Sequence, residues 1–96
     1  MIPFGMPKPI ALDLIRRLVA ADQFMLEPKA LMNIRQRDFT MRQVLTTMKE
    51  GRITQGPERD ECNDWRVRLT KRCAGRLVRV VVAIHDVSFV YVISVH

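Results

Sequence analysis

The sequence predicts one α+β domain, with N-terminal helices packed on a C-terminal twisted antiparallel sheet of about four strands. Apolar residues recur at helical spacing in the first half of the chain, whereas in the second half they alternate or form continuous β-branched runs. The connections between the expected strands are short, which is typical of an antiparallel meander. With 96 residues, 48% of them hydrophobic, the chain suits a single domain with its own core.

The first helix follows an irregular N-terminal lead. Prolines interrupt residues 1–8, and the domain proper is expected to span residues 9–96. Pro9 suits the first turn of a helix, where its missing N–H costs nothing. Apolar residues at helical spacing continue this helix to about residue 21.

The second helix begins after a short apolar link, residues 23–26, which is long enough for a brief strand. Pro28 then fits the first position of a helix that ends near Arg37. Lys29, Asn33 and Arg37 are spaced four residues apart, so they share one face of this helix. That stripe is either a solvated helix face or a set of phosphate contacts.

The third helix has the clearest local signal. Thr40 and Gln43 are spaced as a capping box, in which each side chain accepts a hydrogen bond from the other residue's backbone N–H. Phe39 and Val44 are placed to form the hydrophobic staple that often accompanies such a box. Gly51 is expected to end the helix as a left-handed C-cap.

The second half of the chain predicts four strands. Alternation of apolar and charged residues predicts a half-buried strand, and the two later apolar runs suit central strands covered on both faces. The expected strands are residues 52–55, 65–70, 77–84 and 89–95, with a polar loop at 56–63 and turns at 72–75 and 85–88.

The net charge of +6 favours an anionic partner. RNA, DNA, an acidic protein or an anionic membrane surface would each fit, although a basic balance can also serve solubility alone. No apolar run approaches the roughly 18 residues of a membrane span, and the proline-broken start lacks the apolar core of a signal peptide. We therefore expect a cytoplasmic protein with reduced cysteines and no membrane partner.

The sequence predicts neither a cofactor nor a metal site. It has no glycine-rich phosphate loop and no paired-carboxylate signature. The side chains suited to zinc are Cys62, Cys73, His85 and His96. Their spacings are long and lack the paired pattern that zinc sites show.

One arginine interrupts an apolar strand. Arg79 lies within the run 77–84, where burying an unpaired charge would be costly. It therefore either forms a buried ion pair or opens onto a cleft where it can bind a ligand. The carboxylates available for such a pair are those of Glu27, Asp38 and Asp64.

Strand alternation sorts the other polar side chains by face. Arg66, Arg68 and Thr70 share one face of their strand. On the last strand, Ser94 and His96 share a face. These positions are candidates for contacts with an anionic ligand.

An ordered set of short motifs extends over about residues 12–96. The motifs are Phe24-x-Leu26-x-x-Lys29-Ala30-Leu31, Arg37-x-x-Thr40, Val44, Gly51-Arg52-Ile53, Gly75-Arg76-x-x-Arg79-Val80-Val81-Val82 and Val92-Ile93-Ser94-Val95. With its spacing, this set resembles a small bacterial family, domain of unknown function 4258. Members of that family look like MqsR and RelE toxins and are often encoded beside an antitoxin.

The resemblance implies a RelE-like fold and a toxin that cleaves RNA or blocks translation, held inactive by a cognate antitoxin. Such a toxin would be a metal-independent endoribonuclease acting on free or ribosome-bound RNA, in which a 2′-hydroxyl attacks the neighbouring phosphate. Carried onto this chain, the catalytic candidates are Lys29, Arg37, Arg79 and His96, and the nucleic-acid-binding candidates are Arg66, Arg68 and Arg76.

Five positions depart from the family's pattern. The family commonly has a glycine at the position of Asp38. The family usually has a histidine at the position of Lys29 and an arginine at that of Asn33. It often has a histidine in place of Arg79 and a tyrosine in place of His96. These departures favour an alternative, a catalytically silent RNA- or protein-binding module of the same fold. A third alternative is a structural domain whose basic residues are only solvated surface, and no oligomeric state is predicted.

Overall fold

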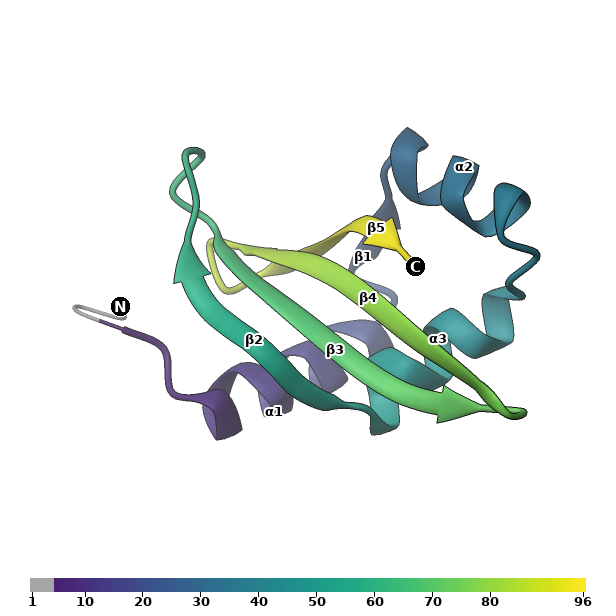
Figure 1. Ribbon diagram of the computed structural model, residues 1–96. Helices are drawn as coiled ribbons and strands as arrows, with labels where there is room; N and C mark the ends of the chain where they lie inside the picture. The colour runs from purple at the N-terminus through teal and green to yellow at the C-terminus, as the bar shows by residue number, and fades with distance from the viewer. Residues whose placement is uncertain (1–4) are drawn as a thin grey trace.

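Helices α1 and α3 lie across one face of a five-stranded sheet, and within residues 5–96 no helix lies across the other face (Figure 1). The computed structural model describes residues 5–96 and confirms the α+β class. In chain order the elements are α1 (Lys8–Ala20), β1 (Phe24–Leu26), α2 (Pro28–Gln36), α3 (Met41–Glu50), β2 (Arg52–Arg59), β3 (Trp65–Cys73), β4 (Arg76–His85) and β5 (Phe89–Val95).

The sheet differs from the predicted antiparallel meander of about four strands. Its strand order is β1-β5-β4-β3-β2, and β1 pairs with β5 in parallel while the other pairs are antiparallel. The short link between the first two helices is therefore a true fifth strand, which makes the sheet mixed. Pairing from Phe24↔Val90 to Leu26↔Val92 joins segments far apart in sequence, so no local pattern could have assigned it.

The core fills the space between α1, α3 and the sheet. Ile15, Met48 and Leu69 are fully buried there, and Trp65, only 7% exposed, belongs to the same core. Met6 also joins this core, although residues 5–7 form no helix or strand. The part of the expected lead at residues 1–4 lies outside the described residues. No helix in residues 5–96 is long and apolar enough to cross a membrane.

The start of α3 is as predicted, but its end is not. Gln43 N–H donates to the Thr40 hydroxyl over 3.1 Å and Thr40 N–H donates to Gln43 Oε1 over 2.9 Å, so the capping box is present. Gly51 has φ −69° and ψ 170°, so the predicted left-handed C-cap is wrong. A Cβ at Gly51 would lie 2.4 Å from the Thr47 carbonyl oxygen. Glycine is needed here because β2 starts at once and passes close to the helix end.

Strand β2 is longer than the sequence predicts. It continues to Arg59 through part of the expected loop at 56–63, with a register shift between the paired residues Gln55 and Glu58. Gly56, at φ +83°, lies in that shift and supplies the backbone conformation that it needs. The turn expected at 72–75 is shorter, because only residues 74 and 75 separate β3 from β4.

The prediction that the two apolar strands are covered on both faces is wrong. Val80 and Val82 of β4 are fully buried on the helix side, whereas Val81, between them, is partly exposed. In the part of the chain that the structure describes, helices cover that side and leave the other uncovered (Figure 1). We call the uncovered side, opposite α1 and α3, the open face.

Candidate nucleic-acid interface

Cross-strand pairing arranges the side chains of the open face in four rows. Side chains alternate along a strand, so the residues between the buried valines of β4 point to the open face, together with their paired neighbours. The rows are Thr70–Arg79–His96, Arg68–Val81–Ser94, Arg66–Ala83–Tyr91 and His85–Phe89.

A bulge in β5 determines which face His96 occupies. Val81 pairs with Ser94 and Val82 pairs with Val92, so Ile93 is an extra, unpaired residue. Strict alternation from Val92 would place Ser94 and His96 on the helix side, and the extra residue moves both to the open face. The predicted sharing of a face by Ser94 and His96 is thus correct, and the bulge decides that this face is the open one.

Helix α2 closes the edge of β5 beyond the end of β1 (Figure 1). The Val95 N–H donates to Asn33 Oδ1 over 3.1 Å, which satisfies a backbone group that β1 does not reach. The side chain of Asn33 therefore faces the sheet. Lys29 and Arg37, four residues to either side of Asn33, are exposed, and both lie close enough to His96 for their charges to lower its pKa.

Four cations surround His96. Its pKa is lowered from 6.5, first by burial and then by the charges of Arg37, Arg79, Arg68 and Lys29. The backbone of His96 is fixed to that of Arg79 by hydrogen bonds of 2.6 and 2.8 Å. We call Lys29, Arg37, Arg68, Arg79 and His96 the basic cluster. It contains all four catalytic candidates and one of the three nucleic-acid-binding candidates.

The charges of the basic cluster are largely uncompensated. Within residues 5–96, neither Lys29, Arg37 nor Arg79 forms an ion pair with a carboxylate. Arg79 thus lacks the ion pair that was one of its two predicted roles. Arg68 donates from Nε to the Thr54 hydroxyl over 3.2 Å, a neutral partner. Cations held close together without counter-charges attract an anionic ligand.

Arg76 holds the connection between α2 and α3. Its guanidinium donates to the carbonyls of Arg37 and Asp38 over 2.7 and 2.8 Å, and it stacks on the Phe39 ring at 4.2 Å. Arg76 was predicted to bind nucleic acid, but these contacts already occupy its guanidinium N–H groups. In this structure Arg76 fixes the backbone that carries Arg37.

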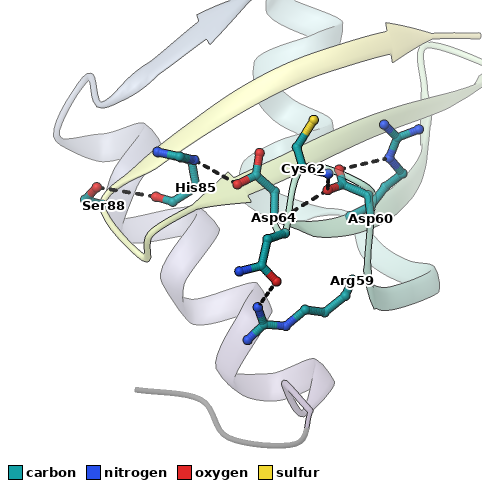
Figure 2. A network of polar contacts seen from close by, with 8 residues as sticks. Arg59, Asp60, Cys62, Asp64, His85 and Ser88 are labelled. Carbon is teal, nitrogen blue, oxygen red and sulfur yellow. Dashed lines mark hydrogen bonds and ion pairs between the residues drawn. The ribbon is translucent and has the colours of Figure 1, made fainter.

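Arg66 lies outside the basic cluster, two rows along the open face. Its Nε is 3.7 Å from Asp60 Oδ2, and its side chain is half exposed. Asp60 also accepts hydrogen bonds from the backbone N–H groups of Cys62 and Asp64, so it orders the β2–β3 loop (Figure 2). Arg66 is thereby held at the loop end of the sheet.

Sequence reasoning missed an aromatic group beside Arg66. The rings of Phe89 and Tyr91 are 5.1 Å apart, and those of His85 and Tyr91 are 6.1 Å apart in an edge arrangement. His85 Nδ1 contacts Asp64 Oδ1 at 2.8 Å (Figure 2). The available signal was the spacing of two between Phe89 and Tyr91, which puts both rings on one face of a strand.

The two cysteines lie in different environments. Cys73 is buried, 3.7 Å from the Thr47 hydroxyl, and Cys62 is exposed in the β2–β3 loop. Of the predicted zinc candidates, His85 contacts Asp64 and His96 belongs to the basic cluster. In the described part of the chain, no three histidine, cysteine or acidic side chains gather to hold a metal ion.

The basic cluster combines two chemical capacities. Arginine guanidinium groups bind phosphate oxygens through paired hydrogen bonds, and they stabilise negative charge that develops on phosphorus-bound oxygens. A histidine whose pKa is lowered is neutral near pH 7, so it can accept a proton. Such an arrangement suits binding of a phosphodiester and abstraction of a proton beside it.

Comparison with known proteins gives one match. No curated protein and no solved structure matches the chain significantly. A family model matches residues 28–96, which is more than half of the chain and includes every residue of the basic cluster. The chain therefore belongs to the family described as domain of unknown function (DUF4258).

Proposed function

We propose that this chain is the toxin component of a bacterial toxin–antitoxin pair, with a RelE-like fold, and that it acts on RNA. The observation that carries the proposal is the basic cluster, in which His96 lies among four cations from α2, the α2–α3 connection, β3 and β4. RNA is the anionic partner that best fits this cluster, because it combines a phosphate with a neighbouring 2′-hydroxyl that a base can deprotonate.

In the proposed reaction, the 2′-oxygen of a ribose attacks the adjacent phosphorus and the bond to the 5′-oxygen breaks. The His96 imidazole accepts the proton of the 2′-hydroxyl. Arg37 and Arg79 stabilise the charge on the phosphoryl oxygens, and the Lys29 ammonium protonates the departing 5′-oxygen. The products are a 2′,3′-cyclic phosphate and a free 5′-hydroxyl. No metal ion takes part in these steps.

The setting of this reaction follows from the resemblance to RelE and MqsR toxins. The RNA is free or bound to a ribosome, and the action is cleavage or a block of translation. A cognate antitoxin protein holds the toxin inactive, and both act in the cytoplasm. The high positive charge of the open face accords with such an RNA partner.

A second candidate function is a catalytically silent module that binds RNA or a protein. The departures from the family pattern at Lys29 and Arg79, where the family has histidines, favour it. Neutralising Arg79 separates the two candidates. A nuclease would lose turnover with a modest loss of affinity, because the charge matters most in the transition state. A silent module would lose affinity alone.

The toxin proposal is tested by controlled expression in growing bacteria. The intact chain is expected to arrest growth and deplete RNA, and replacement of Arg37, Arg66 and Arg79 by alanine is expected to abolish both effects. The matched control replaces Arg17, Arg42 and Lys49 by alanine, which removes the same charge from the exposed surface of α1 and α3.

Three outcomes are informative in this experiment. The proposal is supported if the intact chain and the control arrest growth, but the folded variant with alanine at Arg37, Arg66 and Arg79 does not. Arrest by all three proteins would place the toxic activity away from the open face. No arrest at high soluble expression would contradict the toxin function and favour the silent binding module, for which capture of a partner is the next step.

A further inference from the structure

The aromatic group formed by His85, Phe89 and Tyr91 lies on the open face, in line with the basic cluster. Tyr91 pairs with Ala83 of β4, and His96 is paired through its backbone with Arg79. Ala83 and Arg79 are four residues apart on the same strand, which corresponds to about 13 Å. The two groups therefore lie along one track on the same side of the sheet.

The rings are held in place but keep exposed surface. His85 is anchored by the contact of its Nδ1 with Asp64 Oδ1, and Asp64 has only 13% of its side chain exposed. The His85 side chain is 55% exposed, and Phe89 and Tyr91 are partly exposed. Aromatic rings that are fixed from one side and open on the other can stack with a flat ligand at little entropic cost.

Arginines occupy the track between the two groups. The row that holds Tyr91 also holds Arg66, and the next row toward His96 holds Arg68. Arg66 is half exposed, so its guanidinium can reach a ligand beside the rings. A track with π surface at one end and positive charge along the rest matches a single strand of nucleic acid, which offers bases for stacking and phosphates for the arginines. An apolar protein segment would have to cover these arginines and remove them from water.

We propose that His85, Phe89 and Tyr91 form a base-stacking subsite for single-stranded RNA whose backbone runs past Arg66 and Arg68 to the basic cluster. This inference rests on the proposed function and adds a second contact region to it. A base separated from the reactive phosphate by this length of track stacks on the rings, while Arg66 and Arg68 contact the intervening backbone. The subsite fixes the position of the RNA along β4 and β5 and so selects which phosphate reaches His96.

Binding of an unstructured RNA of about eight nucleotides tests the subsite. Replacing Tyr91 or Phe89 by leucine keeps apolar volume and removes the π surface, so affinity should fall about tenfold for each. Tyr91→Phe keeps a ring and should bind as the intact protein does. The salt dependence of binding should stay the same in all three variants, because no phosphate contact is lost.

A modified RNA supplies the matched control on the ligand side. Abasic nucleotides at all positions remove stacking and keep the phosphates, so the intact protein should bind this RNA weakly, and Tyr91→Leu should bind it as well as the intact protein does. Equal binding of abasic and normal RNA by the intact protein would overturn the subsite and leave the proposed function standing. No RNA binding by the intact protein at low salt would overturn both.

Discussion

Replacing His96 by alanine should lower the rate of RNA cleavage about 10²–10⁴-fold, the usual effect of removing a general base. The affinity for RNA should change little, because the imidazole is held neutral and the four surrounding cations remain. Cleavage is measured on a labelled RNA by the appearance of a 2′,3′-cyclic phosphate end, and affinity is measured with an RNA whose 2′-hydroxyls are methylated.

The pH dependence of cleavage should carry the signature of this histidine. A general base acts in its neutral form, so activity should rise with pH through the pKa of His96, which lies below 6.5 in the free protein. A bound phosphate offsets the charges of Arg37 and Arg79 and raises that pKa. The pH at which kcat rises should therefore be higher than the pH at which kcat/KM rises. The reason is that kcat reports the pKa of His96 in the complex, whereas kcat/KM reports its pKa in the free enzyme.

The control for this prediction is His85→Ala, which removes a histidine of the same sheet outside the basic cluster. Because it removes one ring of the proposed subsite, this variant should lower kcat/KM, but the pH at which kcat/KM rises should stay the same. Cleavage by His96→Ala at the intact rate would exclude His96 as the base. If the intact protein binds RNA but forms no cyclic phosphate end, the silent binding module is the correct function.

Replacing Gly51 by asparagine should destabilise the protein by about 1–3 kcal/mol, the cost of forcing extra atoms into a packed site. A Cβ there would meet the Thr47 carbonyl oxygen at 2.4 Å and the Thr70 carbonyl oxygen at 3.1 Å. Both atoms belong to backbone, in α3 and β3, and neither can move without disturbing its element. The free energy of unfolding, measured by chemical denaturation, gives the size of the effect.

Gly75→Asn is the matched control for this stability prediction. Gly75 has φ +80°, a conformation that asparagine tolerates, and no atom lies within 4 Å of the position of its Cβ. It should change the free energy of unfolding much less than Gly51→Asn does. If the two variants were equally stable, the close approach of β2 to the end of α3 would be wrong.

Local signals in the sequence were sufficient for the helices. Pro28 at the start of α2 and the Thr40–Gln43 box at the start of α3 act within one helical turn, so each could be predicted from neighbouring residues. The pairing of β1 with β5 connects residues 24–26 to residues 90–92, and no local pattern encodes it. Gly51 was predicted for the wrong reason. A glycine is needed there because the Thr47 and Thr70 carbonyl oxygens lie too close for a side chain, and not because the backbone is left-handed.

The sequence predicted which residues belong to the candidate site better than it predicted how they are arranged. Arg79 was noticed because a charge in an apolar strand is costly, and the structure leaves it without an ion pair in residues 5–96. His96 faces the same side only because of the bulge at Ile93, which the sequence does not signal. Arg76 could not be separated from the other arginines, because its contacts with the α2–α3 connection depend on the fold.

The central claim, that RNA binds along the open face at the basic cluster, is tested most directly by nuclear magnetic resonance. Isotope-labelled protein is titrated with a short single-stranded RNA at low salt, and the shifts of backbone amide and arginine Nε signals are followed. We predict large shifts at Arg37, Arg79 and His96 and smaller ones in α1 and α3, all reversed by added salt. The absence of shifts, or shifts centred on α1 and α3, would contradict the account.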